Sequence, residues 1–133
     1  MAFQFSVAAR NAAIDAIETA IGTAAILEIR SGTVPANAAA ADSGTVLATI
    51  SLPTDWLTAA SNGSKTLLGT WSDTSADAAG TAGHFRIKAA GTCHIQGTIT
   101  ATGGGGDMTL DNTSIASGQQ ISITAFTLTA GGA

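Results

Sequence analysis

The sequence predicts a mainly β protein: an antiparallel β-sandwich of jelly-roll or immunoglobulin-like type, with about seven or eight short strands and one N-terminal α-helix. Two observations predict this class. Apolar residues follow the helical period in one stretch near the N-terminus, and elsewhere they alternate with polar residues in short runs separated by turn residues. The chain has 133 residues, which fits one domain. We expect an arm and helix in residues 1–22 and a sandwich in residues 23–133, packed as one domain.

The helix is expected between Ser6 and Gly22. Serine is a typical N-cap residue, glycine is typical just after a helix, and the alanines between them favour helix formation. The larger apolar residues recur at helical spacing and form one narrow stripe: Val7, Ile14, Ile17 and Ile21. Such a stripe has to be buried, so we expect it to pack on the sheet or on another subunit.

The first strand is expected in residues 25–30. Leu27 and Ile29 share one face of this run, and Glu28 and Arg30 share the other. Alternation of this kind predicts a strand with one face in the core and one face in solvent.

A loop and a second strand follow. Residues 36–44 have no periodicity, which indicates a surface loop. Alternation returns in residues 45–52 and ends at Pro53, because proline has no N–H to donate to a sheet. Trp56 and Leu57 are then expected as the buried anchors of the next connection.

The clearest alternation predicts a β-hairpin of residues 83–88 and 93–99, with a turn at Ala90 and Gly91. The side chains expected to face the core are those of Phe85, Ile87, Cys93, Ile95 and Ile99. Those expected to face solvent are His84, Arg86 and Lys88, which form the most basic part of the chain.

Shorter strands complete the expected sandwich in residues 66–71, 108–110 and 120–128. In the last of these, Ile123 and Phe126 are three residues apart and cannot share one face of a regular strand. A β-bulge near Ala125 would bring both side chains to the core.

Composition describes a small, weakly charged protein. Hydrophobic residues make up 45% of the chain, but 28 of them are alanines, so bulky core side chains are few. With 5 Lys and Arg against 9 Asp and Glu, the chain lacks the basic surface that binding to nucleic acids or acidic membranes requires. No apolar run reaches the roughly 20 residues of a membrane span, and the N-terminus does not resemble a signal peptide. Cys93 is the one cysteine, which excludes an intrachain disulfide and fits a reducing compartment.

Cysteine and histidine offer the first candidates for chemistry. Cys93 and His94 are adjacent, and neighbouring strand residues point to opposite faces, so a regular strand cannot hold them as a thiolate–imidazolium pair. His84 and His94 could approach each other across the hairpin, but two histidines without a carboxylate are an incomplete zinc site. We expect a buried structural thiol and two exposed histidines.

Aspartates and glycines offer the remaining candidates. Asp73, Asp77 and Asp107 could supply oxygen ligands for calcium, but their spacing does not match the helix–loop–helix motif, and solvated turn residues are the simpler interpretation. The four glycines of residues 103–106 lack the Lys-Ser/Thr pair of a phosphate-binding loop and indicate a turn. The sequence therefore assigns no catalytic, cofactor-binding or metal-binding residue, and no cofactor.

Four segments together resemble a known group of proteins: Ala8–Ile17, Leu27–Gly32, Ser72–Arg86 and Thr113–Ile123. In these segments the chain resembles a family of small virion structural proteins of tailed bacteriophages and prophages. The resemblance implies a non-enzymatic protein that decorates or cements the capsid. The alternative it leaves open is a tail- or baseplate-associated module, including a receptor- or carbohydrate-binding domain.

The same resemblance implies partners and a location. The partners would be the major capsid protein or proteins of the tail and baseplate, together with further copies of the chain in a homo-oligomer. The location would be the virion, assembled in the bacterial host cytoplasm. With no tyrosine and only two tryptophans, the chain has few aromatic side chains for stacking on sugars, which favours the structural role.

Overall fold

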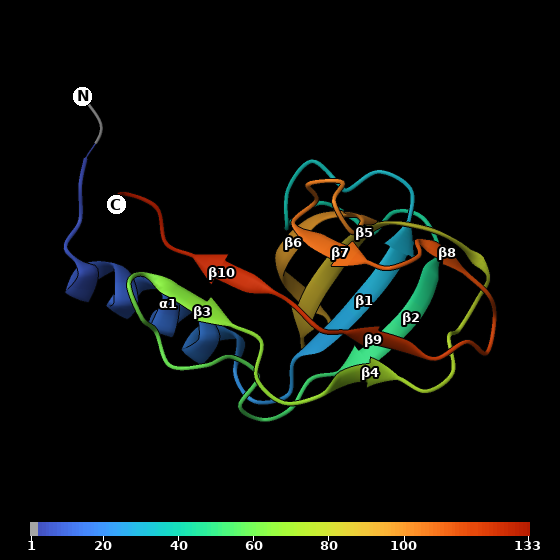
Figure 1. Cartoon of the computed structure of the whole chain (residues 1–133), viewed down its shortest axis with the longest axis horizontal. Coiled ribbons are helices and arrows are strands. Elements are labelled where there is room, and N and C mark those ends of the chain that lie inside the picture. The colour runs from blue at the N-terminus through green and yellow to red at the C-terminus, as the bar shows by residue number, and fades with distance from the viewer. Residues whose placement is uncertain (1–2) are drawn as a thin grey trace.

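The computed structural model describes residues 3–133, and this part of the chain forms one helix and ten strands (Figure 1). The elements are α1 (Val7–Ile21), β1 (Ile26–Ser31), β2 (Val46–Ser51), β3 (Ser64–Thr66), β4 (Trp71–Asp73), β5 (Gly80–Ala89), β6 (Thr92–Ala101), β7 (Met108–Leu110), β8 (Ser114–Ile115), β9 (Ile121–Ile123) and β10 (Thr127–Thr129). Figure 1 shows α1, β3 and β10 gathered at one end, beside a curled sheet. We call α1, β3, β10 and the described terminal segments the helix lobe, and the remaining strands the sheet body. The helix is not long and apolar enough to cross a membrane.

The main sheet has the order β2-β1-β5-β6-β7, with β8 paired to β5. Neighbouring strands of this sheet are antiparallel, except that β6 and β7 are parallel and place Ile99 opposite Met108. Residues 102–107 carry the chain back beside Ile99 without reversing its direction. The prediction of a mainly β protein with one N-terminal helix is therefore confirmed. A purely antiparallel sheet is wrong, and an antiparallel sandwich is not confirmed, because the sheet is mixed and curled and two further strand pairs, β3–β10 and β4–β9, stand apart from it.

Aromatic side chains fill the centre of the sheet body. Trp56 and Trp71 are fully buried, with ring centroids 6.1 Å apart. Phe126 lies 5.4 Å from Trp71 and 5.8 Å from Phe85, which it meets edge to face. Leu57 is also buried, so the prediction of Trp56 and Leu57 as core anchors is confirmed.

The two ends of α1 are capped as the sequence predicts. Ser6 Oγ accepts a hydrogen bond from the Ala9 N–H at 3.1 Å, which satisfies one of the free donors of the first turn. Gly22 has φ of +89°, and its N–H donates to the Glu18 carbonyl. The Gly22 carbonyl accepts from Trp56 Nε1 at 3.1 Å, so the C-terminal end of the helix is fixed to the core of the sheet body.

The apolar stripe of α1 is only partly buried. Ile14 and Ile21 are in the interior, but Val7 is 44% exposed and Ile17 is 38% exposed. The prediction that the whole stripe packs on the sheet is therefore wrong. The sheet body contacts only the C-terminal part of the helix, and the short strand β3 leaves Val7 and Ile17 exposed.

The expected last strand is divided into β9 and β10. β9 pairs with β4 in the sheet body, whereas β10 pairs with β3 in the helix lobe. Both Ile123 and Phe126 are buried, as expected, but the change of phase between them is a break in the strand and not a bulge at Ala125. The chain passes from one region to the other at this point.

Candidate functional site

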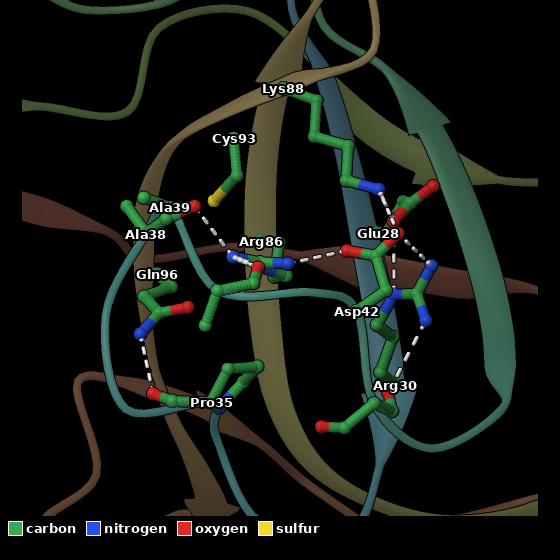
Figure 2. A network of polar contacts seen from close by, with 12 residues as sticks. Glu28, Arg30, Pro35, Ala38, Ala39, Asp42, Arg86, Lys88, Cys93 and Gln96 are labelled. Carbon is green, nitrogen blue, oxygen red and sulfur yellow. Dashed lines mark hydrogen bonds and ion pairs between the residues drawn. The ribbon is translucent and has the colours of Figure 1, made fainter.

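Among residues 3–133, the largest group of interacting charges lies on one face of the main sheet (Figure 2). Phe85 and Ile87, which alternate with these charged residues on β5, belong to the core on the other face. Five residues form this charged cluster: Glu28 and Arg30 of β1, Asp42 of the β1–β2 connection, and Arg86 and Lys88 of β5. Antiparallel pairing places Glu28 opposite Arg86. Side chains of neighbouring strands therefore meet on this face, and Asp42 reaches them from the loop above.

Asp42 contacts all three cations of the cluster. Its carboxylate accepts hydrogen bonds from Arg86 Nη1, from Lys88 Nζ at 2.6 Å and from Arg30 Nη2 at 3.1 Å. The hydrogen bond from Lys88, followed by that from Arg86, lowers the pKa of Asp42 from 3.8 to about 2 against the opposing effect of burial. The carboxylate is therefore ionised throughout the physiological range.

The loop that carries Asp42 wraps over Arg86. We call residues 33–44 the cover loop. Arg86 Nη2 donates to the carbonyls of Ala38 and Ala40 at 2.8 and 3.0 Å, and Gln96 Nε2 donates to the Pro35 carbonyl at 2.7 Å. Figure 2 shows these contacts converging on the sheet from the loop. Arg86 uses its planar donors to bind loop carbonyls and a carboxylate together.

The expected solvent exposure of this face is wrong. Arg86 is 2% exposed, Arg30 is 7% exposed and the Lys88 side chain is 12% exposed. Alternation correctly separated these residues from the aromatic core, but the cover loop excludes solvent from the second face as well. The loop was expected to lie on the surface, whereas it covers part of the sheet.

Charge balance explains how the cluster tolerates burial. Burial alone would lower the pKa of Lys88, but hydrogen bonds to Asp42 and Glu28 outweigh this effect and raise it. Burial would also lower the pKa of Arg86, and the hydrogen bond to Asp42 again raises it. Every cation thus faces a carboxylate, which is the condition for keeping charge in an interior. This arrangement holds the cover loop on the sheet.

The two histidines are not brought together. His84 is fully buried, contrary to the expected exposure, and its Nδ1 lies 3.0 Å from the Gly32 carbonyl oxygen. Across the hairpin it pairs with Thr98, whereas His94 lies near the other end and is exposed, as expected. The backbone at Gly32 approaches so closely that a Cβ at Gly83 would lie 2.2 Å from its oxygen. His84 is buried because the backbone segment at Gly32 covers it.

Cys93 lies on the charged face and not in the core, so its expected place with Ile95 and Ile99 is wrong. Ile87 is opposite Ile95, but the next residue, Lys88, is opposite Cys93, which makes His94 the extra residue of a β-bulge. A one-residue shift transfers Cys93 to the other face. Its thiol is half-buried, donates to the Ile95 carbonyl at 3.3 Å and lines a hollow of about 450 Å³ with Arg86 and the cover loop.

Two of the three candidate aspartates, Asp73 and Asp77, meet at Thr49 of β2, and the third binds Thr98 of β6. Asp73 accepts from the Thr49 N–H at 3.0 Å, and Asp77 accepts from the Thr49 hydroxyl at 2.7 Å. Asp107 accepts from the Thr98 N–H at 2.9 Å. Asp73 and Asp77 thus stabilise the edge of β2, and Asp107 stabilises β6. Within residues 3–133 no group of three or more His, Cys, Asp or Glu residues has a metal-binding arrangement.

The glycine-rich segment of residues 103–106 forms the turn between β6 and β7, as predicted. Gly106 N–H donates to the Thr100 hydroxyl at 3.0 Å. A Cβ at Gly104 or Gly106 would lie within 3 Å of Thr100 atoms. Glycine is therefore required here by the close approach of the turn to β6.

No sequence pattern singles out Asp42, which lies after a run of alanines in an aperiodic segment. The one available signal was indirect. Arg86 and Lys88 alternate with core residues on one strand, and Arg30 occupies the corresponding face of another, so three cations needed counter-charges beyond Glu28. Nothing in the sequence shows which distant carboxylate supplies them.

Compared with known proteins, the chain matches no family model, no curated protein and no solved structure. Its residues and their geometry define a small mixed-sheet protein that combines a covered, charge-paired sheet with a partly uncovered helix lobe.

Proposed function

We propose that this chain is a non-enzymatic structural protein of a bacteriophage particle and that it decorates or cements the capsid in many copies. The observation that carries the proposal is the contrast between the two regions. The sheet body has the aromatic core on one face and the charged cluster under its cover loop on the other, whereas the helix lobe presents Phe3, Phe5, Val7 and Ile17 to solvent.

Exposed apolar side chains in one lobe favour a protein–protein contact. Phe3 is 85% exposed and Phe5 is 55% exposed, and both belong to the segment that leads into α1. Large apolar side chains gathered at one surface mark sites of interaction with proteins, membranes or ligands. Contacts with neighbouring molecules of a particle, whether further copies of this chain or the major capsid protein, would cover this surface and stabilise the chain by linkage.

Charge also fits assembly beside other proteins. Arg86 and Lys88, on the face of the main sheet under the cover loop, form ion pairs with Glu28 and Asp42 of the same chain. The chain has a formal net charge of −4 at pH 7. Binding to nucleic acid through this face would require breaking the internal ion pairs. Packing on other virion proteins requires no such change.

A tail- or baseplate-associated, carbohydrate-binding module is the second candidate. One observation favours it: a hollow of about 360 Å³ is lined by amide, hydroxyl and carboxylate groups, including those of Asp111, Asn112, Gln119 and Gln120. Such groups recognise sugar hydroxyls. Both tryptophans are buried in the core, however, so the indoles do not supply the stacking surface that usually accompanies such groups.

Composition of purified particles tests the proposal. Particles released from a host that carries the gene should contain the chain in tens to hundreds of copies when the protein bands are quantified against the major capsid protein. Separation of heads from tails then distinguishes the two candidates: the chain should remain with heads. Recovery with tails alone would favour the second candidate, and absence from the particles would refute both.

A further inference from the structure

We propose that two copies of this chain associate through the apolar surface of the helix lobe, in a twofold-symmetric contact that inserts Phe3 of each copy into the other. This inference deepens the proposed function, because it names the first partner of the surface on which that proposal rests. The association of the purified chain is measured on its own, so its result is distinct from the presence of the chain in particles.

The surface contains a groove of about 730 Å³. Phe3 and Phe5 of the arm form one side, Ala13 and Ile17 of α1 form another, and residues 129–132 complete it. The Phe5 N–H donates to the Gly132 carbonyl at 2.6 Å, which holds the arm beside the C-terminal segment. The groove is therefore built from segments that are distant in the sequence and fixed to one another.

The exposed area suits a dimer core. Taking roughly 200 Å² for a whole phenylalanine side chain, the 85% exposure of Phe3 and 55% exposure of Phe5 leave about 280 Å² uncovered in each copy. Two copies would bury roughly 560 Å² from these rings alone, close to half of the ~1,200 Å² at the lower end of stable interfaces. The helix and residues 129–132 around the rings would supply the rest.

A second copy fits because the protruding group and the hollow belong to the same surface. Phe3 projects from one side of a groove whose other walls include small residues, among them Ala9, Ala13 and Gly131. A projecting ring and a receiving hollow on one patch are what a twofold contact requires, since each copy then offers both to the other. Small residues leave room for the incoming ring.

Charge permits the same contact. Arg10 is the charged residue among those that line the groove, and its Nη1 donates to the Asn62 carbonyl at 3.0 Å. This bond holds the guanidinium at the Asn62 turn, so a twofold contact brings one cation from each copy and not a cluster of like charges. An acidic lipid surface is a poorer occupant, because anchoring on it requires several basic residues beside the apolar ones.

Sedimentation equilibrium of the full chain tests the proposal, with concentrations from micromolar to several hundred micromolar. The wild type should show a reversible monomer–dimer equilibrium. Phe3→Ser should raise the dimer dissociation constant at least about 30-fold, as expected for a central aromatic anchor. Because Phe3 is so exposed, this variant keeps the fold of the monomer, which near-ultraviolet circular dichroism of Trp56 and Trp71 verifies.

Ile17→Ser and Leu68→Ser form a matched pair. The two residues are 38% and 37% exposed, but Ile17 lines the groove and Leu68 does not. Ile17→Ser should weaken the dimer about tenfold, and Leu68→Ser should change it less than about threefold. A monomeric wild type, or a dimer that Phe3→Ser and Ile17→Ser leave unchanged, would overturn the inference. Either result leaves the particle measurement to decide the proposed function.

Discussion

In the sheet body, the buried cations lie between the main sheet and the cover loop. In the helix lobe, Lys65 is buried under α1 alone. Lys65 Nζ lies 2.6 Å from Asp15 Oδ1 and also contacts Glu18, both of α1. Hydrogen bonds to these carboxylates raise the pKa of Lys65 although burial alone would lower it. Both regions thus neutralise a buried cation with acids from a distant segment.

The surroundings of the ion pairs differ. The body adds the rings of Trp56, Trp71, Phe85 and Phe126, all of which are buried. In the lobe, Ile14 is buried but lies outside the continuous core. Ion pairs contribute less to stability than apolar burial does. The same kind of ion pairing thus fastens a loop to a stable sheet in the body and holds together a lobe that has little core of its own.

The largest effect should come from removing an aromatic ring of the body. Trp71→Ala should lower the free energy of unfolding by about 4 kcal/mol, because a large side chain packed between Trp56 and Phe126 leaves a cavity. Phe3→Ala, in the lobe, should change it by less than about 0.5 kcal/mol at concentrations where the chain is monomeric. Urea unfolding measures both, and similar losses would contradict the division into a packed body and an open lobe.

A smaller loss is expected from the charged cluster. Asp42→Asn should destabilise the body by about 2 kcal/mol, because Arg86 stays buried while its counter-charge is removed. The value is below that of a fully buried pair because the Asp42 side chain is 38% exposed. Asp55→Asn, at an exposed position, provides the control. Limited proteolysis should cut the cover loop faster in Asp42→Asn; resistance equal to wild type would show that the cluster does not hold the loop.

Acid should weaken the same contact. A carboxyl group whose pKa is lower in the folded state stabilises the fold above its unfolded pKa and loses that contribution as the pH falls through its folded pKa. For Asp42 this window runs from pH 3.8 to about 2. We expect a loss of about 1 kcal/mol across it, since the side chain is partly exposed to solvent. Thermal unfolding at several pH values measures the step, and the step should be smaller in Asp42→Asn.

The smallest global effect is expected in the helix lobe. In Glu18→Gln, Asp15 still neutralises Lys65, so the free energy of global unfolding should change by less than about 1 kcal/mol. Hydrogen exchange in α1 should nevertheless accelerate about fivefold, because the lobe opens locally. Amides of β5 serve as the internal reference. Equal acceleration in α1 and β5 would show that the two regions unfold together.

Local features of the fold could be predicted from the sequence. The cap at Ser6, the end of the helix at Gly22 and the turn at residues 103–106 depend on neighbouring residues, and the structure has all three. The division between core-facing and charged side chains of β5 also follows from simple alternation, because Phe85 belongs to the core and Arg86 pairs with Asp42 on the other face.

Features that depend on distant contacts could not be predicted. The burial of Arg86 requires the cover loop, whose alanines carry no periodic signal. The face on which Cys93 lies depends on one bulged residue, His94, because a shift by one residue exchanges the two faces of a strand. The candidate site was missed for the same reason: the carboxylate of Asp42 comes from a segment more than forty residues before its partner Arg86.

Both described ends of the chain lie in the helix lobe, joined by the hydrogen bond between Phe5 and Gly132. Tension applied at these ends would first reach this contact and then the short β3–β10 pair, which has three residue positions in register. The lobe would therefore peel open while the long β1–β5 and β5–β6 pairs remained closed. In an assembly that swells or is pulled, the lobe would lengthen as an extensible tether and leave the sheet body intact.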